Sequence, residues 1–314
     1  MKAQQADLPR IEEKPAGEVY PLSTWLNLVC LDAPLVATAW LWLFARTFHV
    51  SLQFGNTVAL FLTAWLIYLA DRVADASSLN PNLPRSFRQD FCLRHREIWI
   101  ATVALVAGFD AYVIWRTTAW ATVIVGAVVG VLALIYLVLN HPLGLIWRSL
   151  PAKELAIGVL FAAGTMVALL PGPPFTPIFA IAVVLFAALC AFNCISIATW
   201  ERDLDLVQGK VSIATRHPSV ARHIRKFCVV LALNALAVAL VFRSTMPLFA
   251  CLGVSAFLLA WLSKSPSCKE GRFSNHRRSR SRGIIRRSLD RDERTALADL
   301  VLLTPLVVLI VSAL

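Results

Sequence analysis

Nine apolar stretches, each about 16 to 24 residues long, recur along the chain. At 1.5 Å per residue, a helix of about 20 residues crosses the roughly 30 Å of hydrocarbon in a bilayer. The alternating polar and apolar residues of a membrane β-barrel strand are absent from these stretches. We therefore predict an all-α integral membrane protein. Its expected spans are residues 24–45, 52–70, 98–115, 118–138, 154–170, 177–200, 227–242, 246–262 and 296–314.

The composition agrees with a membrane location. Of the 314 residues, 58% are hydrophobic and only 16% are charged. A soluble domain of this size carries a far more polar surface, because charged residues make up about a quarter of an average soluble sequence. The composition therefore excludes an ordinary soluble enzyme or binding domain.

The distribution of Lys and Arg predicts the orientation of the spans. With nine spans, 27 of the 30 basic residues fall on one side of the membrane, and only Arg46, Arg116 and Arg243 fall on the other. Loops rich in Lys and Arg stay in the cytoplasm of a cell. We expect the N-terminus inside, the C-terminus outside, and the helices packed around a central cavity.

The expected organisation is a cytoplasmic segment at residues 1–23, followed by one membrane domain at residues 24–314. Residues 263–294 form a Ser/Arg-rich insert in that domain. Its positive charge favours contact with anionic membrane lipids. No aromatic residues alternate with the basic ones in the Arg277–Arg282 run, so we expect no nucleic-acid partner.

Two of the predicted helices end in acidic residues. Asp71 and Asp75 follow the second span, and Glu201 and Asp205 follow the sixth. Residues four apart share one face of a helix, so each pair of carboxylates points the same way. Both ends lie on the predicted cytoplasmic side, and adjacent anions at a membrane helix end are costly without a cation between them. We expect the two ends to face each other across one site.

Carboxylates in this arrangement suit Mg²⁺, a hard ion that takes oxygen ligands and shares them with substrate phosphates. Two facing clusters would place the ion on a diphosphate, where it acts as a Lewis acid on the departing pyrophosphate. Nearby Arg and Lys side chains would hold the remaining phosphate oxygens. The apolar helices would enclose the rest of the substrate, which points to a lipid with a diphosphate head.

The first acidic helix end resembles the first motif of the UbiA-type membrane-embedded prenyltransferases, roughly N-D-x-x-D-x-x-x-D after helix two. Here the corresponding stretch runs from Ile67 to Asp75. Asp71 and Asp75 match the last two acids, and Arg72 stands where the family often has Arg. Ile67 and Tyr68 replace the leading Asn and Asp. The missing Asn removes an oxygen donor from the metal site that the resemblance implies.

The second end resembles the family's D-x-x-x-D motif after helix six, with Glu201 and Asp205 followed by Gly209 and Ser212. The resemblance covers about residues 20–314 apart from the basic insert. It implies Mg²⁺-dependent transfer of a polyprenyl group from a polyprenyl diphosphate to an aromatic or other lipophilic acceptor. It also implies the site residues. Metal and diphosphate binding is expected at Asp71, Asp75, Glu201 and Asp205, and substrate contacts at Tyr68, Arg72, Lys153, Asn193, Arg202 and Asp203.

Two other functions stay open at this stage. Without the leading Asn, the chain is either an enzyme in which another group, such as Tyr68, compensates, or a relative that binds a prenyl lipid without turnover. A transporter is a third reading. Helices broken by Gly or Pro and charges in mid-membrane would favour it, and the predicted spans show few of either. In each case we expect a multi-pass protein of the bacterial cytoplasmic membrane, with the site facing the cytoplasm.

Overall fold

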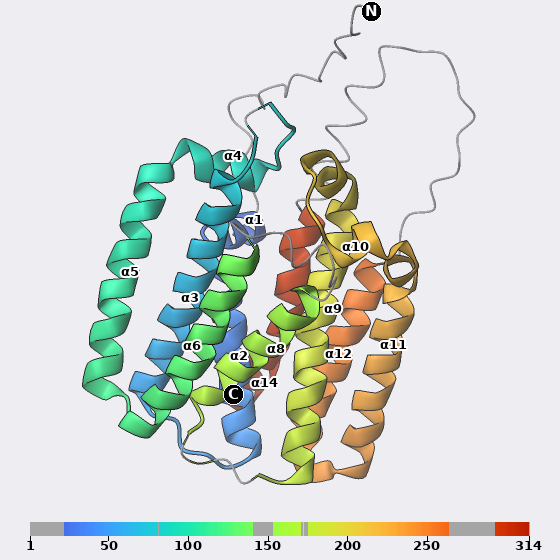
Figure 1. Ribbon diagram of the computed structural model, residues 1–314. Helices are drawn as coiled ribbons and strands as arrows, with labels where there is room; N and C mark the ends of the chain where they lie inside the picture. Colours follow the sequence, from blue (N-terminus) through green and yellow to red (C-terminus); the bar gives the residue numbers. More distant parts are fainter. Residues whose placement is uncertain are drawn as a thin grey trace, which may run out of the picture.

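The computed structural model describes residues 22–80, 82–140, 153–170, 172, 175–263 and 293–313. These residues form a bundle of helices without a strand, and most helices run roughly along one common direction (Figure 1). The helices are α1 Leu22–Leu28, α2 Asp32–Thr47, α3 Phe54–Ser77, α4 Phe87–Arg94, α5 Arg96–Thr117, α6 Trp120–Asn140, α8 Lys153–Val167, α9 Pro177–Gln208, α10 Ile213–Arg216, α11 Pro218–Val241, α12 Met246–Leu262 and α14 Pro305–Ala313. Residues 293–300 are also helical, and short 3₁₀ turns lie at Arg243–Thr245 and Val301–Leu303.

Six helices of the described chain are long and apolar enough to cross a membrane, and a seventh is added if the bent C-terminal pair counts as one span. The protein is therefore a helical multi-pass membrane protein. Each of the nine predicted stretches contains helix. However, α2 and α8 have only 16 and 15 residues, fewer than the roughly 20 that cross the hydrocarbon core. Nine crossings and the sidedness of the two termini stay predictions.

The first and last predicted spans are interrupted. Between α1 and α2 the chain turns at Cys30, whose φ of 58° is left-handed. Near the other end, the helix at Glu293–Leu303 meets the following helix at 45°. The bend lies just before Pro305, whose ring and missing N–H do not fit inside a helix but are accepted in its first turn. The length of the apolar stretches predicts one continuous helix in each place, and the structure shows a break instead.

The largest buried cluster joins the two ends of the chain. Trp40, Phe44, Phe186 and Phe249 are fully buried within it. The rings of Trp40 and Phe186 lie 4.8 Å apart, and the indole nitrogen of Trp40 donates to the carbonyl oxygen of Leu302 at 2.8 Å. This contact ties α2 to the C-terminal segment, so residues far apart in the sequence share one core.

Helices α8 and α9 are packed closely at Gly158. A Cβ atom at this position would lie 2.5 Å from the backbone nitrogen of Ala191 and 2.7 Å from the carbonyl oxygen of Ala187. Small residues permit such close approach of membrane helices. At the start of α8, Glu154 is buried and its Oε1 accepts from the backbone nitrogen of Ile213 at 3.0 Å. Together the two contacts fix the position of α8 beside α9 and α10.

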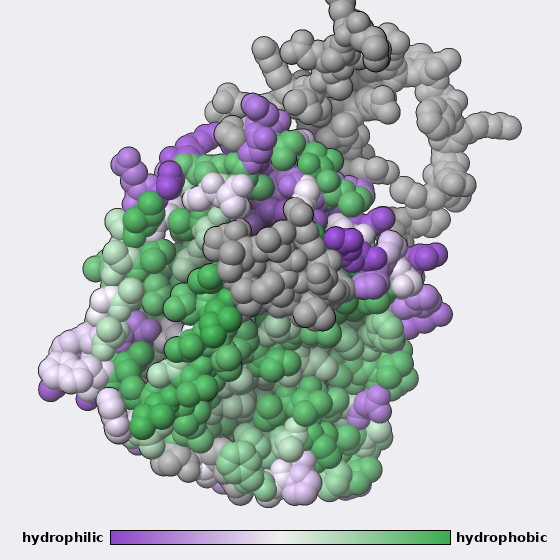
Figure 2. All heavy atoms as spheres, in the orientation of Figure 1, coloured by the Kyte–Doolittle hydropathy of each residue, from purple (hydrophilic) through white to green (hydrophobic). Residues whose placement is uncertain are grey.

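The surface is divided along the bundle. In Figure 2 apolar side chains cover most of the visible face, and hydrophilic residues gather at the end that carries α4 and α10 (Figures 1 and 2). The C-terminal ends of α3 and α9, with both acidic motifs, lie at this same end. Most of the predicted N-terminal segment, and the basic insert apart from residues 263, 293 and 294, lie outside the described residues.

Candidate functional site

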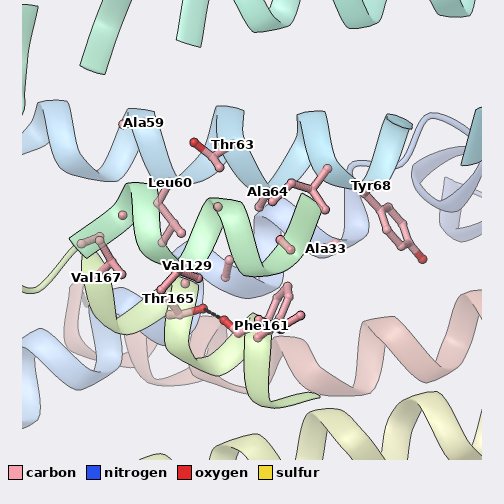
Figure 3. A pocket seen from close by; sticks show the side chains of 18 of the residues that line it. Ala33, Ala59, Leu60, Thr63, Ala64, Tyr68, Val129, Phe161, Thr165 and Val167 are labelled. Atoms are coloured by element: carbon pink, nitrogen blue, oxygen red, sulfur yellow. Dashed lines mark hydrogen bonds between the residues drawn. The ribbon is translucent and has the colours of Figure 1, made fainter. Parts of the chain in front are cut away.

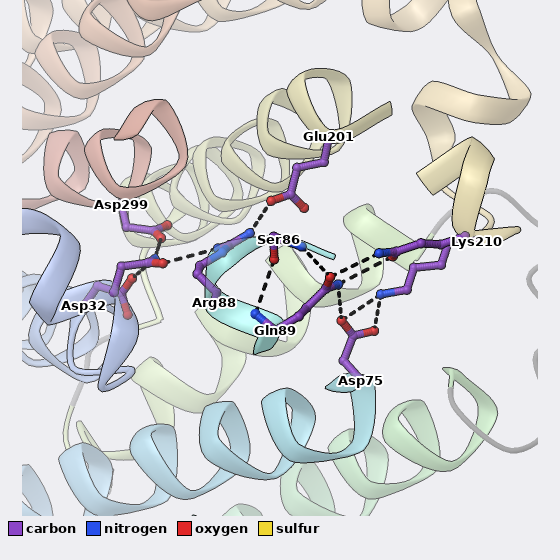
Figure 4. A network of polar contacts seen from close by, with 10 residues as sticks. Asp32, Asp75, Ser86, Arg88, Gln89, Glu201, Lys210 and Asp299 are labelled. Carbon is purple, nitrogen blue, oxygen red and sulfur yellow. Dashed lines mark hydrogen bonds and ion pairs between the residues drawn. The ribbon is translucent and has the colours of Figure 1, made fainter. Parts of the chain in front are cut away.

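Helix α4 lies between the two acidic helix ends. Its first turn is fixed by a capping box: Ser86 Oγ accepts from the backbone nitrogen of Gln89 at 3.3 Å, and Gln89 Oε1 accepts from the backbone nitrogen of Ser86 at 2.9 Å. Reciprocal caps of this kind satisfy two backbone donors that a helix leaves free. The cap places Arg88 and Gln89 side by side, with one toward α9 and the other toward α3 (Figure 4).

Arg88 links α9 to a buried polar cluster. Its guanidinium forms an ion pair with Glu201 on α9, and its other terminal nitrogen donates to Asn27 Oδ1 at 3.3 Å. The Asn27 amide donates to Asp32 at 2.6 Å and to Asp299 at 3.3 Å. Residues of α1, α2, α4, α9 and the helix at residues 293–300 therefore meet in this network (Figure 4).

Asp299 extends the same network toward the middle of α9. Its Oδ1 accepts from the Asn193 amide at 2.7 Å. Asp32 and Asn193 are buried, with 2% and 5% of their surface exposed. Buried carboxylates within a membrane bundle are costly and tend to mark sites of function. Amide donors from Asn27 and Asn193 reduce that cost by hydrogen bonding to the carboxylates.

Asp75 is held from the opposite side by Lys210, which lies just after α9. The Lys210 ammonium donates to both oxygens of Asp75, at 2.6 and 2.7 Å. Gln89 adds a longer contact to Asp75 at 3.4 Å. Lys153, the first residue of α8, is within electrostatic range of both Asp75 and Asp205. Two lysines therefore lie beside carboxylates of both acidic motifs, as the cost of adjacent anions predicts.

The other predicted site residues fall into two groups. Asp71 is within electrostatic range of Arg72, and Asp205 is a neighbour of Glu201 and accepts from the Ser212 side chain. The Arg72 guanidinium lies over the Tyr68 ring, 5.4 Å from its centre. These residues belong to the polar end of the bundle. Two others do not join the network: Asp203 is exposed on α9, and Arg202 is half-buried with its Nε lacking a hydrogen-bond partner among the described residues.

Cys30 lies beside this cluster, at the turn between α1 and α2. The thiol is fully buried. It is a free cysteine, and a free thiol that is buried behaves as a small apolar group.

A cavity of about 510 Å³ opens below the polar network. It is enclosed by α2, α3, α5, α6, α8 and α9 and is lined mostly by apolar side chains (Figure 3). Tyr68, Asn193 and Asp299 line it as well. Because Asn193 and Asp299 also belong to the hydrogen-bonded network, the apolar cavity and the charged cluster are two parts of one site.

A preformed metal centre is not visible in the described part of the chain. There, no three His, Cys, Asp or Glu side chains converge in a way that would hold an ion. The carboxylates of Asp75 and Glu201 are each paired with a cation instead. Their oxygens are nevertheless the donors that Mg²⁺ takes, and Mg²⁺ is often held by one or two carboxylates together with substrate phosphates. The donor chemistry thus fits an ion that enters with a diphosphate.

Sequence reasoning missed Asn27, Asp32, Arg88 and Asp299. A signal for two of them was present: Asp32 and Asp299 are carboxylates inside the apolar stretches predicted as the first and last spans. Ionisable residues within membrane segments are candidates for function by default. Arg88 carried no comparable signal, because it lies in a loop with several other basic residues.

Comparison of the chain with protein-family models, with curated proteins and with solved structures gave no match.

Proposed function

We propose that the protein is a UbiA-type prenyltransferase, which moves a polyprenyl group from its diphosphate to an aromatic or other lipophilic acceptor and releases pyrophosphate. One observation carries the proposal: a mostly apolar cavity of about 510 Å³ meets a cluster of acidic and basic side chains at Asn193 and Asp299. A substrate with a hydrocarbon chain and a charged head needs both environments in contact.

The charged cluster supplies partners for a diphosphate. Lys153 and Lys210 lie beside Asp75, and Arg88 lies beside Glu201. An incoming diphosphate would compete with these carboxylates for the cations and would free carboxylate oxygens for Mg²⁺. We assign the ion to Asp71, Asp75, Glu201 and Asp205. When bound, Mg²⁺ stabilises the charge that develops on the leaving pyrophosphate.

The orientation of the site follows from the same proposal. Among the described residues, Arg88, Lys153 and Lys210 of the predicted positive-inside loops lie at the end of the bundle that carries the network, so we propose that this end faces the cytoplasm. A bacterial cytoplasmic membrane would then supply the prenyl chain laterally and the diphosphate head from the inner leaflet. Membrane lipids are the surrounding solvent, and the acceptor enters the apolar cavity.

The test is release of pyrophosphate from a panel of polyprenyl diphosphates by the purified protein with Mg²⁺. We expect Asp71→Ala and Asp205→Ala to abolish release. Asp90→Ala serves as the matched control, since Asp90 lies on α4 and its side chain pairs, within the described part of the chain, only with Arg85 at 3.6 Å. Loss of activity in the control, or full activity in both site variants, would contradict the assignment.

Ile67 supports a second candidate function, the binding of a prenyl lipid without turnover. Ile67, where the family motif has Asn, lines the cavity and presents hydrocarbon where an oxygen donor is expected. This favours a protein that binds a prenyl diphosphate without turnover. The two functions are separated by measuring binding and release together. If lipid diphosphate binds but no pyrophosphate forms, Ile67→Asn tests whether the missing donor is the reason, because it restores the motif at a position that faces the ligand.

A further inference from the structure

A second polar group lies deep in the apolar wall of the cavity, away from the charged network. Asp110 is on α5 and is 4% exposed, and it lines the cavity. The hydroxyl of Thr63 on α3 donates to its Oδ2 at 2.7 Å. Its Oδ1 has no hydrogen-bond partner in the described ranges. Buried carboxylate oxygens are usually hydrogen-bonded, so Oδ1 of this cavity-lining residue can accept from a donor on a ligand.

Two more polar atoms of residues that line the cavity also lack a hydrogen-bond partner among the described residues. Asn56 and Thr118 both line the cavity, and within the described chain neither Asn56 Oδ1 nor Thr118 Oγ1 has a partner. Asn56 is 5% exposed, and its amide nitrogen makes only a long contact with the carbonyl oxygen of Ala168, at 3.5 Å. By contrast, the Thr165 hydroxyl, which also lines the cavity, is satisfied by the Phe161 carbonyl of its own helix at 2.9 Å (Figure 3).

The position of Asp110 distinguishes it from the acidic helix ends. Its partner Thr63 lies eight residues before Asp71 on α3, which corresponds to about 12 Å along the helix axis. Figure 3 shows the cavity following α3 from Ala59 past Thr63 to Tyr68. A hydrocarbon chain alone would fill this volume and leave the three polar atoms unpaired.

We propose that the cavity binds a lipophilic molecule that carries a hydrogen-bond donor, a hydroxyl or an ammonium group, and that this donor contacts Asp110 Oδ1. Asp110 accepts from the ligand on one oxygen and from Thr63 on the other, so Thr63 positions the carboxyl group. Asn56 and Thr118 offer further contacts to a polar group on the ligand. This specificity does not depend on prenyl transfer and would hold for a protein that only binds lipid.

The experiment compares three ligands of nearly equal shape: farnesol with a hydroxyl group, farnesylamine with an ammonium group, and the hydrocarbon farnesene. Binding to the full chain in lipid nanodiscs is measured by displacement of a radiolabelled farnesol tracer. We expect farnesol or farnesylamine to bind about tenfold more tightly than farnesene, the scale of one good hydrogen bond in an apolar site. Whichever of the two binds better identifies the donor.

The variants locate the contact. Asp110→Leu should abolish the preference for the polar ligand while farnesene still binds, which also shows that the variant is folded. Thr63→Val should reduce the preference, and Thr165→Val, the matched control, should leave it unchanged. The proposal is overturned if all three ligands bind wild-type protein equally, which would mean that water alone meets Asp110. It is also overturned if Asp110→Leu keeps the full preference, which would place the donor at the charged end.

Discussion

Lys210 donates to both carboxylate oxygens of Asp75, at 2.6 and 2.7 Å, and so connects the end of α3 to the segment that follows α9. The two residues are 135 positions apart in the chain. Their contact brings the two acidic motifs to one site. It also neutralises the Asp75 carboxylate, which would otherwise attract a divalent ion. The ion pair therefore links α3 to the segment after α9, and Lys210 competes with a divalent ion for Asp75.

Replacing Lys210 with Met should lower stability, because Asp75 then lacks its cation. We expect a loss of about 1–2 kcal/mol, less than for a fully buried pair, since the Asp75 side chain keeps a third of its exposure. Thermal unfolding in detergent measures the change. Lys210→Arg, which keeps the charge, should recover most of the loss. An unchanged melting temperature in Lys210→Met would show that the pair is not formed.

Replacing Arg88 with Met should be more costly, because Glu201 and Asn27 both lose a donor. The Arg88 and Glu201 side chains are only 10% and 19% exposed, and breaking a largely buried pair costs about 2–4 kcal/mol. Arg94→Met is the matched control, since Arg94 is exposed at the end of the same helix. In a double-mutant cycle, Glu201→Gln should reduce the cost of Arg88→Met. Additive effects of the two changes would contradict a direct contact.

Gly158→Ala should destabilise the bundle, because the added methyl group meets the backbone of α9 at 2.5 to 2.7 Å. Backbone atoms cannot rotate away, so the helices must separate, at a cost of about 1–3 kcal/mol. Gly164→Ala on the same helix is the control: its Cβ would have its nearest neighbour at 4.0 Å, an ordinary contact. Denaturation of both variants in the same detergent compares them directly, and equal stability would show that α8 and α9 are farther apart.

The Cys30 thiol should resist alkylation in the folded protein. Its side chain has no exposed surface, so a reagent reaches the thiol only when the surrounding helices open. Maleimide labelling at pH 8, read by peptide mass spectrometry with and without denaturant, tests this. Rapid labelling of Cys30 without denaturant would contradict it.

Helix content and the location of the acidic motifs followed from local pattern. Apolar length predicted helix in every stretch, and the spacing of Asp71 and Asp75 placed both at the end of α3. The pairing of Asp75 with a cation also followed from the cost of adjacent anions, although its identity as Lys210 did not. Nothing in local sequence relates these two positions, because the contact depends on how α3 and α9 pack.

The two helix breaks and the buried polar network could not be predicted from local sequence, because both depend on contacts between distant segments. The turn at Cys30 and the bend before Pro305 lie in stretches whose apolar composition alone suggests an unbroken helix. Asp32 and Asp299 are tolerated inside those stretches because Asn27 and Asn193 donate to them. A single residue's hydropathy does not reveal partners from other helices. The network residues that composition could have indicated were those two carboxylates, as charges in apolar surroundings.

The hydrogen bond from Asn27 to Asp299 joins positions separated by 272 residues. During synthesis Asn27 enters the bilayer long before Asp299 leaves the ribosome. Helix α1 must therefore insert without this hydrogen bond, which forms only when the segment that carries Asp299 has inserted as well. A chain that ends before Asp299 would leave the amides of Asn27 and Asn193 without this acceptor.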